Sequence, residues 1–128
     1  MAEPDQMTIN IKRIYEGYSP EDGWRILVDR VWPRGISKEK AHLDDWYKDL
    51  APSNELRKWF GHIPAKFNEF ARRYYQELDL NSEAQASIIQ ILAKCNDGNV
   101  TMLYSARDTE HNQAVVLRKY IGEKASKI

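Results

Sequence analysis

A short loop at residues 29–35 carries side chains that can bind an anion. Arg30 and Arg34 each present a planar guanidinium group, which matches the oxygens of a phosphate or a carboxylate. Gly35 would let a ligand come close to the backbone, because glycine has no side chain. Trp32 lies between the two arginines and is predicted to contact the ligand, with packing at the rim of the site as the alternative.

A second loop at residues 105–112 carries groups that can move a proton. His111 can change its charge near neutral pH, and Asp108 could orient the imidazole or act as a base. Asn112 adds an amide that can bind a ligand. His111 and Asp108 are therefore the candidate catalytic residues, and Asn112 is a candidate ligand-binding residue.

Several of these residues also have a structural interpretation. Arg30 could form an ion pair with Asp29 or Asp45, since arginine often acts as a structural donor. Asp108 is a natural helix N-cap, a role that is compatible with a place in the site. Asn112 could equally be a surface amide, and His111 could be solvated in the first turn of a helix.

The two loops follow predicted strands. Residues 8–15 alternate in polarity, 24–31 are apolar at their centre, and 100–104 form a short apolar run after Gly98. In open α/β sheets, ligands bind outside the carboxyl ends of the strands. If the second and last strands are parallel neighbours, Arg30, Arg34, Asp108, His111 and Asn112 lie in one pocket at that edge.

Helical periodicity fills the stretch between these strands. Ser37 is predicted to cap a short turn, Ser53 to cap a helix, and Asn81-Ser82 to begin another, while Asp108 or Thr109 is predicted to cap the last helix. The expected core comprises Ile26, Val28, Phe67, Phe70, Tyr74, Ile88, Leu92, Met102 and Leu117.

The order of elements predicts a single α/β domain. We expect a small, mostly parallel sheet of about four strands flanked by helices over residues 8–122, with a frayed end at 1–7 and a loose end at 123–128. The short link between the first two strands favours an antiparallel hairpin, with separate places in one sheet as the alternative. Residues 43–48 are either a short strand or irregular.

Composition excludes several classes of protein. The 19 basic and 19 acidic residues give a net charge of zero, which does not support nucleic-acid binding. The three histidines have no metal-ligand spacing, so we expect no metal, with a site of His62, His111 and a carboxylate as the alternative. The glycine-rich motifs of nucleotide-binding proteins are absent, so we expect no cofactor. No apolar run is long enough for a membrane span, and the polar first residues indicate a cytoplasmic protein. The sequence does not indicate an oligomeric state.

Residues outside the two loops have simpler interpretations. Lys48, Ser53, Arg57 and His62 form a looser polar set. A solvated charged face explains Arg57, a helix cap explains Ser53, and His62 is expected to lie in a loop, where alone it is not a metal ligand. Cys95 continues an apolar helix face, so it is expected to be a buried and unreactive thiol.

Three phrases of the sequence resemble a known family. They are RVWPRG at residues 30–35, LAPSNELR with WFGH at 50–62, and LYSARD followed by HN at 103–112. These phrases resemble the YeaO-like branch of the domain-of-unknown-function family 488, over about residues 11–120. The resemblance implies a bacterial or archaeal α/β domain and implies no activity.

Two functions therefore compete. The first is a site for a phosphate- or nucleotide-like anion, with His111 and Asp108 as an acid–base pair of an enzyme. The alternative is a non-catalytic ligand-binding module or a protein-interaction module, in which the tryptophans and tyrosines form an interface.

Overall fold

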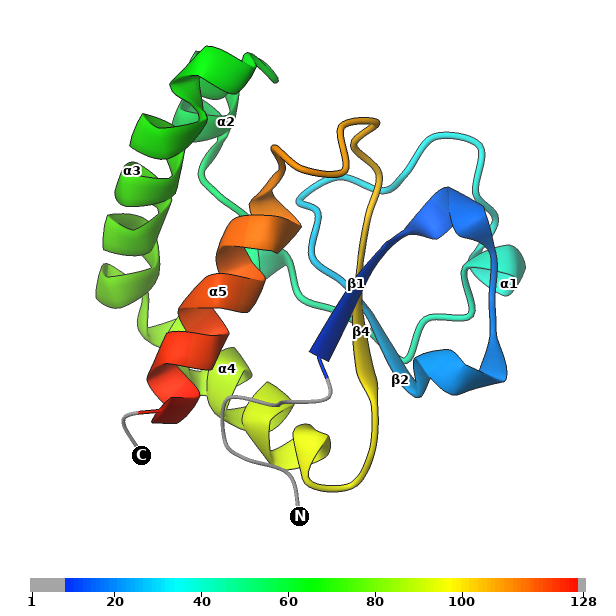
Figure 1. Cartoon of the computed structure of the whole chain (residues 1–128). Helices are drawn as coiled ribbons and strands as arrows, with labels where there is room; N and C mark the ends of the chain where they lie inside the picture. Colours follow the sequence, from blue (N-terminus) through cyan, green and yellow to red (C-terminus); the bar gives the residue numbers. More distant parts are fainter. Residues whose placement is uncertain (1–8, 127–128) are drawn as a thin grey trace.

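Four strands form one sheet in the order β1-β4-β2-β3, and every neighbouring pair runs parallel. The structure is a computed structural model that describes residues 9–126, and its strands are β1 (Ile9–Arg13), β2 (Trp24–Leu27), β3 (Asp45–Trp46) and β4 (Val100–Tyr104) (Figure 1). This arrangement confirms the predicted α/β fold with a parallel sheet. The segment 43–48 contributes the two-residue strand β3 at the edge of the sheet.

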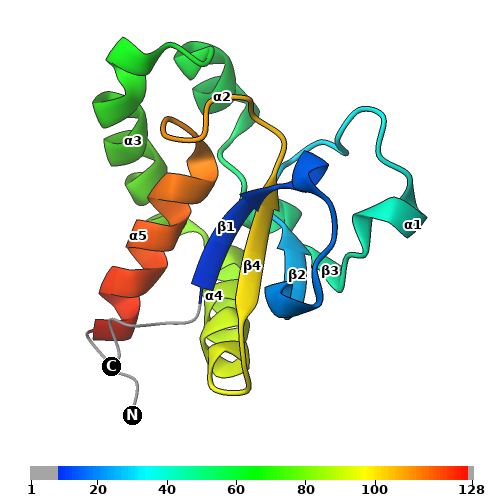
Figure 2. The same ribbon diagram turned by 45° about the vertical axis from the view of Figure 1, so that its right-hand side comes forward.

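The predicted hairpin between the first two strands is wrong, and the alternative of separate places in the sheet is confirmed. Strands β1 and β2 lie on opposite sides of β4, as Figure 2 shows. Every residue of β4 is buried, as expected for a strand that pairs on both edges and packs on both faces. The link at residues 14–23 contains two 3-10 turns instead of the tight turn that a hairpin requires.

Strand β2 ends earlier than the apolar run predicts. The backbone N–H of Val28 still donates to the carbonyl of Leu103, at 3.1 Å. One residue later, the side chain of Asp29 accepts a hydrogen bond from the backbone N–H of Ser105, at 3.0 Å. A side chain thus takes the place of the next ladder bond, and the two chains separate at this point.

Four helices cover one face of the sheet (Figure 1). They are α2 (Asn54–Phe60), α3 (Phe67–Leu80), α4 (Ser82–Cys95) and α5 (Gln113–Ser126). Ser53 and Asn81 cap α2 and α4 through hydrogen bonds from backbone N–H groups, as predicted.

The main core lies between the sheet and these helices. Of the nine predicted core residues, Phe67 and Leu92 are only partly buried against it. The other seven are buried, namely Ile26, Val28, Phe70, Tyr74, Ile88, Met102 and Leu117. The helical periods therefore identified the inward faces correctly, and the two exceptions lie at the margins of those faces.

The opposite face of the sheet carries a smaller core beneath α1 (Lys38–Ala41), which Ser37 caps as predicted. Arg25 is buried on this side with 1% of its surface exposed, and it forms an ion pair with Asp22. Its guanidinium also donates to the carbonyls of Ala41 and His42, at 2.9 and 3.1 Å. Arg25 is a structural residue, because these partners satisfy the buried charge.

The last helix differs from its predicted bounds at both ends. It begins at Gln113, after the cap that the sequence predicts, and continues through Ser126, past the residue at which a loose end was expected. The predicted frayed segment 1–7 lies outside the described residues. No helix within residues 9–126 has the length and apolar character needed to cross a membrane.

Candidate functional site

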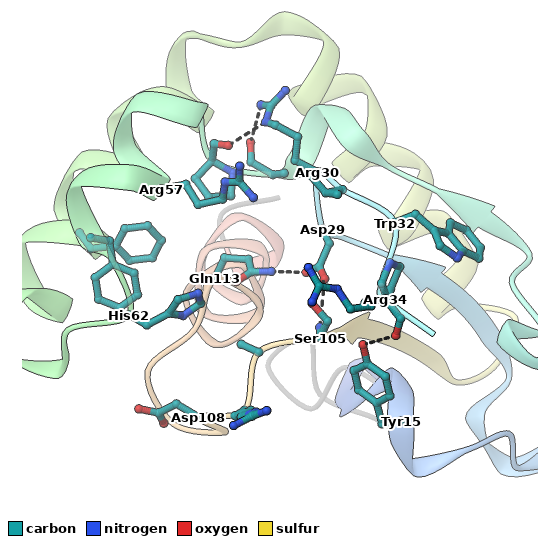
Figure 3. A pocket seen from close by; sticks show the side chains of 18 residues that line it. Tyr15, Asp29, Arg30, Trp32, Arg34, Arg57, His62, Ser105, Asp108 and Gln113 are labelled. Atoms are coloured by element: carbon teal, nitrogen blue, oxygen red, sulfur yellow. Dashed lines mark hydrogen bonds between the residues drawn. The ribbon is translucent and has the colours of Figure 1, made fainter. Parts of the chain in front are cut away.

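A cavity of about 680 Å³ opens at the carboxyl ends of β2 and β4. As the sequence analysis required, β2 and β4 are parallel neighbours, so the loops that follow them lie at the same edge of the sheet. The volume lies within the range of about 300–1,000 Å³ that is typical of small-molecule sites. The lining comes from the two predicted loops, residues 51–52, α2, His62, the first residue of α5, Tyr15, and Phe70 of α3 (Figure 3).

Asp29 lies in the middle of this lining and is 7% exposed (Figure 3). Its Oδ2 accepts hydrogen bonds from the backbone N–H and the hydroxyl of Ser105, at 3.0 and 2.7 Å. Its Oδ1 accepts a hydrogen bond from the side-chain amide of Gln113. Burial raises the pKa of the Asp29 carboxyl, and these hydrogen bonds oppose the rise. Asp29 is thus a fixed, buried carboxyl group in the cavity.

Sequence reasoning considered Asp29 only as an ion-pair partner for Arg30. The sequence did contain a signal for a role of Asp29 in the site, because this carboxylate directly follows a buried apolar strand and begins a loop that carries arginines. Trp46 reinforces its position, because the indole N–H donates to the backbone carbonyl of Asp29 at 2.7 Å.

Three exposed arginines line the cavity from separate parts of the chain. Arg34 comes from the first loop, Arg57 from α2 and Arg107 from the second loop. The hydroxyl of Tyr15 donates to the backbone carbonyl of Arg34 at 2.7 Å, which ties this loop to the segment after β1. Gly35 follows with a φ of 80°, a left-handed conformation that glycine adopts without strain.

Arg30 also lines the cavity, but its guanidinium turns away from Asp29 (Figure 3). Its Nε donates to the carbonyl of Pro52 at 3.1 Å, and its Nη2 lies 3.4 Å from the carbonyl of Ala51. Neither of the ion pairs considered for Arg30 forms within the described part of the chain. Arg30 therefore holds the segment before α2 in place.

Trp32 lies at the margin of the cavity with its indole turned away from Asp29 (Figure 3). The indole N–H donates to the carbonyl of Ile36 at 2.6 Å, and the ring meets that of Trp46 edge-on, with 5.4 Å between centroids. This placement matches the alternative of rim packing.

Asp108 and His111 form a pair, of which only Asp108 lines the cavity. The Asp108 carboxylate accepts from the backbone N–H groups of Glu110 and His111, at 2.9 and 3.0 Å, and lies 2.9 Å from His111 Nδ1. These backbone hydrogen bonds lower the pKa of Asp108. The His111 ring contacts Phe67 on α3, at 5.1 Å between centroids. Asp108 thus orients the imidazole as expected, but the ring packs beside the cavity.

Asn112, and neither Asp108 nor Thr109, caps the last helix. Asn112 is 1% exposed, and its side-chain oxygen accepts from the backbone N–H of Val115 at 3.1 Å. Its side-chain amide donates to the carbonyl of Asp108 at 2.9 Å. The predicted cap was wrong. The Asp108 carboxylate accepts from the N–H groups of Glu110 and His111, which precede the helix, whereas Asn112 is the residue directly before its first turn.

Arg57, predicted to lie on a solvated face, and His62, predicted to lie in a loop, both line the cavity. Helix α2 ends at Gly61, where the φ is 55°, and His62 follows with a φ of 58°. Two consecutive left-handed residues redirect the chain, so that His62 lines the cavity (Figure 3). Its ring lies 6.1 Å from that of Phe60, between centroids. Periodicity alone does not indicate where a helix end points.

The cavity combines cationic groups with a single buried carboxyl group, an arrangement that suits a small anion better than a metal ion. Within residues 9–126, no three histidine, cysteine, aspartate or glutamate side chains form a group that could hold a metal. Cys95 on α4 is half-buried and not fully buried as predicted, and this partial burial raises the pKa of its thiol to about 11, which disfavours the reactive thiolate.

Comparisons with known proteins identify the family of this chain. A family model described as the inactive DUF488-N3 subclade, DUF488-N3i, matches residues 8–127. The chain is 40% identical over 115 residues to the uncharacterized protein YeaO of Escherichia coli (strain K12), covering 90% of this chain and 97% of YeaO.

Mycobacterial relatives are equally similar. An uncharacterized protein of Mycobacterium tuberculosis (strain ATCC 25618 / H37Rv) is 40% identical over 113 residues, covering 88% of this chain and 92% of the relative. The search of solved structures found no significant match. Since the family model covers nearly the whole sequence, the chain belongs to the DUF488 family, as a YeaO-like member of its inactive DUF488-N3 subclade.

Proposed function

We propose that this protein binds a small phosphate-bearing molecule in the cavity at the carboxyl ends of β2 and β4, without transforming it. The observation that carries the proposal is the convergence of Arg34, Arg57 and Arg107 on one cavity. Within the described residues, none of the three forms an ion pair with a carboxylate, so their charges remain available to an anion.

The non-catalytic form of the proposal rests on the arrangement of the acid–base pair. A general acid or base must reach the reacting group within hydrogen-bond distance. The His111 ring packs against Phe67 and does not line the cavity, so the imidazole of the pair is not placed to transfer a proton to a ligand there. The description of the matching subclade as inactive supports the same conclusion.

Isothermal titration calorimetry with inorganic phosphate at constant ionic strength tests the binding. A charged hydrogen bond contributes about 1.5–3 kcal/mol, so Arg34→Ala and Arg57→Ala should each weaken phosphate binding roughly ten- to a hundred-fold. Arg118→Ala is the matched control, because Arg118 is an exposed arginine of α5 that does not line the cavity.

An equal loss of phosphate affinity in all three variants would mean that binding depends only on the overall charge of the protein. This result would overturn the proposed site. Phosphorus NMR of glucose 6-phosphate incubated with the protein tests the absence of catalysis. We expect the spectrum to stay unchanged, and any product that requires the protein would contradict the non-catalytic proposal.

A further inference from the structure

Resting on the proposed function, we infer that the ligand carries hydroxyl groups in addition to its phosphate, and that Asp29 accepts a hydrogen bond from one of them inside the cavity. The ligand class is therefore a phosphorylated polyol or sugar. The three exposed arginines would hold the phosphate, and the buried carboxylate would select the remainder of the molecule.

The hydrogen bonds of Asp29 leave room for a ligand. An ionised carboxylate offers about four acceptor positions. Three are used by protein donors, namely the backbone N–H of Ser105, its hydroxyl, and the side-chain amide of Gln113. One position on a cavity-lining carboxylate therefore remains for a donor that enters from the cavity.

The phosphate itself is a poor partner for Asp29 when this carboxyl is ionised. A phosphate against an ionised carboxylate would place like charges together. Arg34 and Arg57 are exposed, whereas Asp29 is buried, so the anion is expected toward the solvent and a neutral donor toward the interior. Figure 3 shows Arg57 and His62 on one side of Asp29 and Arg34 on the other.

A hydroxyl group fits this position better than an ammonium group. Arg34, Arg57 and Arg107 line the same cavity, so a neutral donor adds no further positive charge there, whereas an ammonium group would. A hydroxyl can donate to the ionised form and accept from the protonated form, whereas an ammonium group can only donate. The cavity of about 680 Å³ is also far larger than a phosphate ion needs and has space for a sugar phosphate.

The test compares sorbitol 6-phosphate with n-hexyl phosphate, which have the same number of carbons and the same phosphate group. The Kd of each is measured by calorimetry for the wild type and for Asp29→Asn. In the variant, the side-chain oxygen can still accept from Ser105, and the new amide can face a flipped Gln113, so the fold is kept while the free acceptor is lost. The ratio of the two Kd values cancels effects of the substitution on phosphate binding, and the change of this ratio between the wild type and the variant cancels any general preference for an apolar chain.

We expect the preference for sorbitol 6-phosphate over n-hexyl phosphate to fall about ten-fold in Asp29→Asn, because a hydrogen bond to a charged carboxylate is replaced at best by a weaker, neutral one from the amide. Inorganic phosphate should bind the variant at least as tightly, because a like charge has been removed. An unchanged ratio would overturn the inference and leave phosphate binding intact. Failure of inorganic phosphate to bind the wild type would instead overturn the proposed function.

Circular dichroism and thermal unfolding establish that the variant is folded. Should Asp29→Asn fail to fold, Asp29→Ser is measured with the same pair of ligands. Serine keeps a hydroxyl for Gln113 or Ser105 but has no carboxylate, so the same fall in the ratio is expected. A ratio equal to that of the wild type would again overturn the inference.

Discussion

At the residue scale, the chemistry of the cavity depends on one buried carboxyl group among several arginines. Asp29 is placed by three hydrogen bonds, while Arg34 and Arg57 remain exposed. Arg30, which has the same charge, has become part of the scaffold because two backbone carbonyls engage it. The role of each arginine thus follows from its surroundings and not from its residue type.

The raised pKa of Asp29 predicts how stability depends on pH. The folded state holds this proton more tightly than the unfolded state does, where the pKa is near 3.8. Asp29 therefore contributes its full amount to the free energy of unfolding below the unfolded-state pKa. This contribution is lost as the pH rises through the raised pKa of the folded state. The free energy of unfolding of the wild type relative to Asp29→Asn should fall over that window.

Urea unfolding of both proteins between about pH 4 and 8 measures this difference. Other carboxylates, such as Asp108, have lowered pKa values and give the opposite trend, but they contribute equally to both proteins and cancel. A difference that stays constant with pH would show that Asp29 titrates normally in the folded state.

At the element scale, the start of α5 is decided by Asn112. This side chain is buried and uses both its oxygen and its amide in hydrogen bonds. Asn112→Ala should destabilise the protein by about 1–2 kcal/mol, because a helix cap is lost and its partners are left unsatisfied. Chemical denaturation measures the change.

Thr109→Ala is the matched control, since Thr109 is exposed and was a candidate for the same role. Its effect should stay within about 0.5 kcal/mol. A larger loss for Thr109→Ala than for Asn112→Ala would show that the helix begins where the sequence pattern predicted.

The stripe of aromatic residues on α3 gives a second prediction at this scale. Phe70 is 1% exposed and stacks on Phe60, with 4.3 Å between ring centroids. Phe70→Ala should cost about 3–5 kcal/mol in the free energy of unfolding. Phe67→Ala, on the same helix but at a half-buried position, should cost less. A loss below about 1 kcal/mol for Phe70→Ala would contradict the assigned helix face.

At the scale of the whole molecule, β4 joins two cores. Met102 faces the main core beneath the helices, and Leu103 faces the smaller core beneath α1. Because one strand contributes to both cores, we predict a single cooperative unfolding transition, in keeping with the expected single domain.

Tryptophan fluorescence and far-UV circular dichroism should give coincident urea transitions. Trp32 and Trp46 pack against the smaller core, whereas Trp24 and Trp59 pack against the main one. A variant with Trp32→Phe and Trp46→Phe reports only on the main core and should show the same midpoint as circular dichroism. Separate midpoints for the two sets of tryptophans would contradict a single cooperative unit.

The sequence was sufficient for features that depend on local periodicity and composition. The helical faces of α3 and α4, the caps at Ser37, Ser53 and Asn81, and the buried strand β4 all follow from spacing along the chain. Such features are decided by neighbours three or four residues away, or by the solvation of a short apolar run. The position of two polar loops after strands likewise predicted the edge of the sheet at which the cavity opens.

Only the tertiary structure decided which side chains reach that cavity. The strand order depends on non-local pairing, so the parallel insertion of β4 between β1 and β2 could not be inferred from the short link between them. Arg57 and His62 enter because α2 docks beside the strand ends, and His111 is left out because its ring meets Phe67. A pattern along the chain specifies what each side chain can do, but the directions of side chains from distant segments are determined by packing in three dimensions.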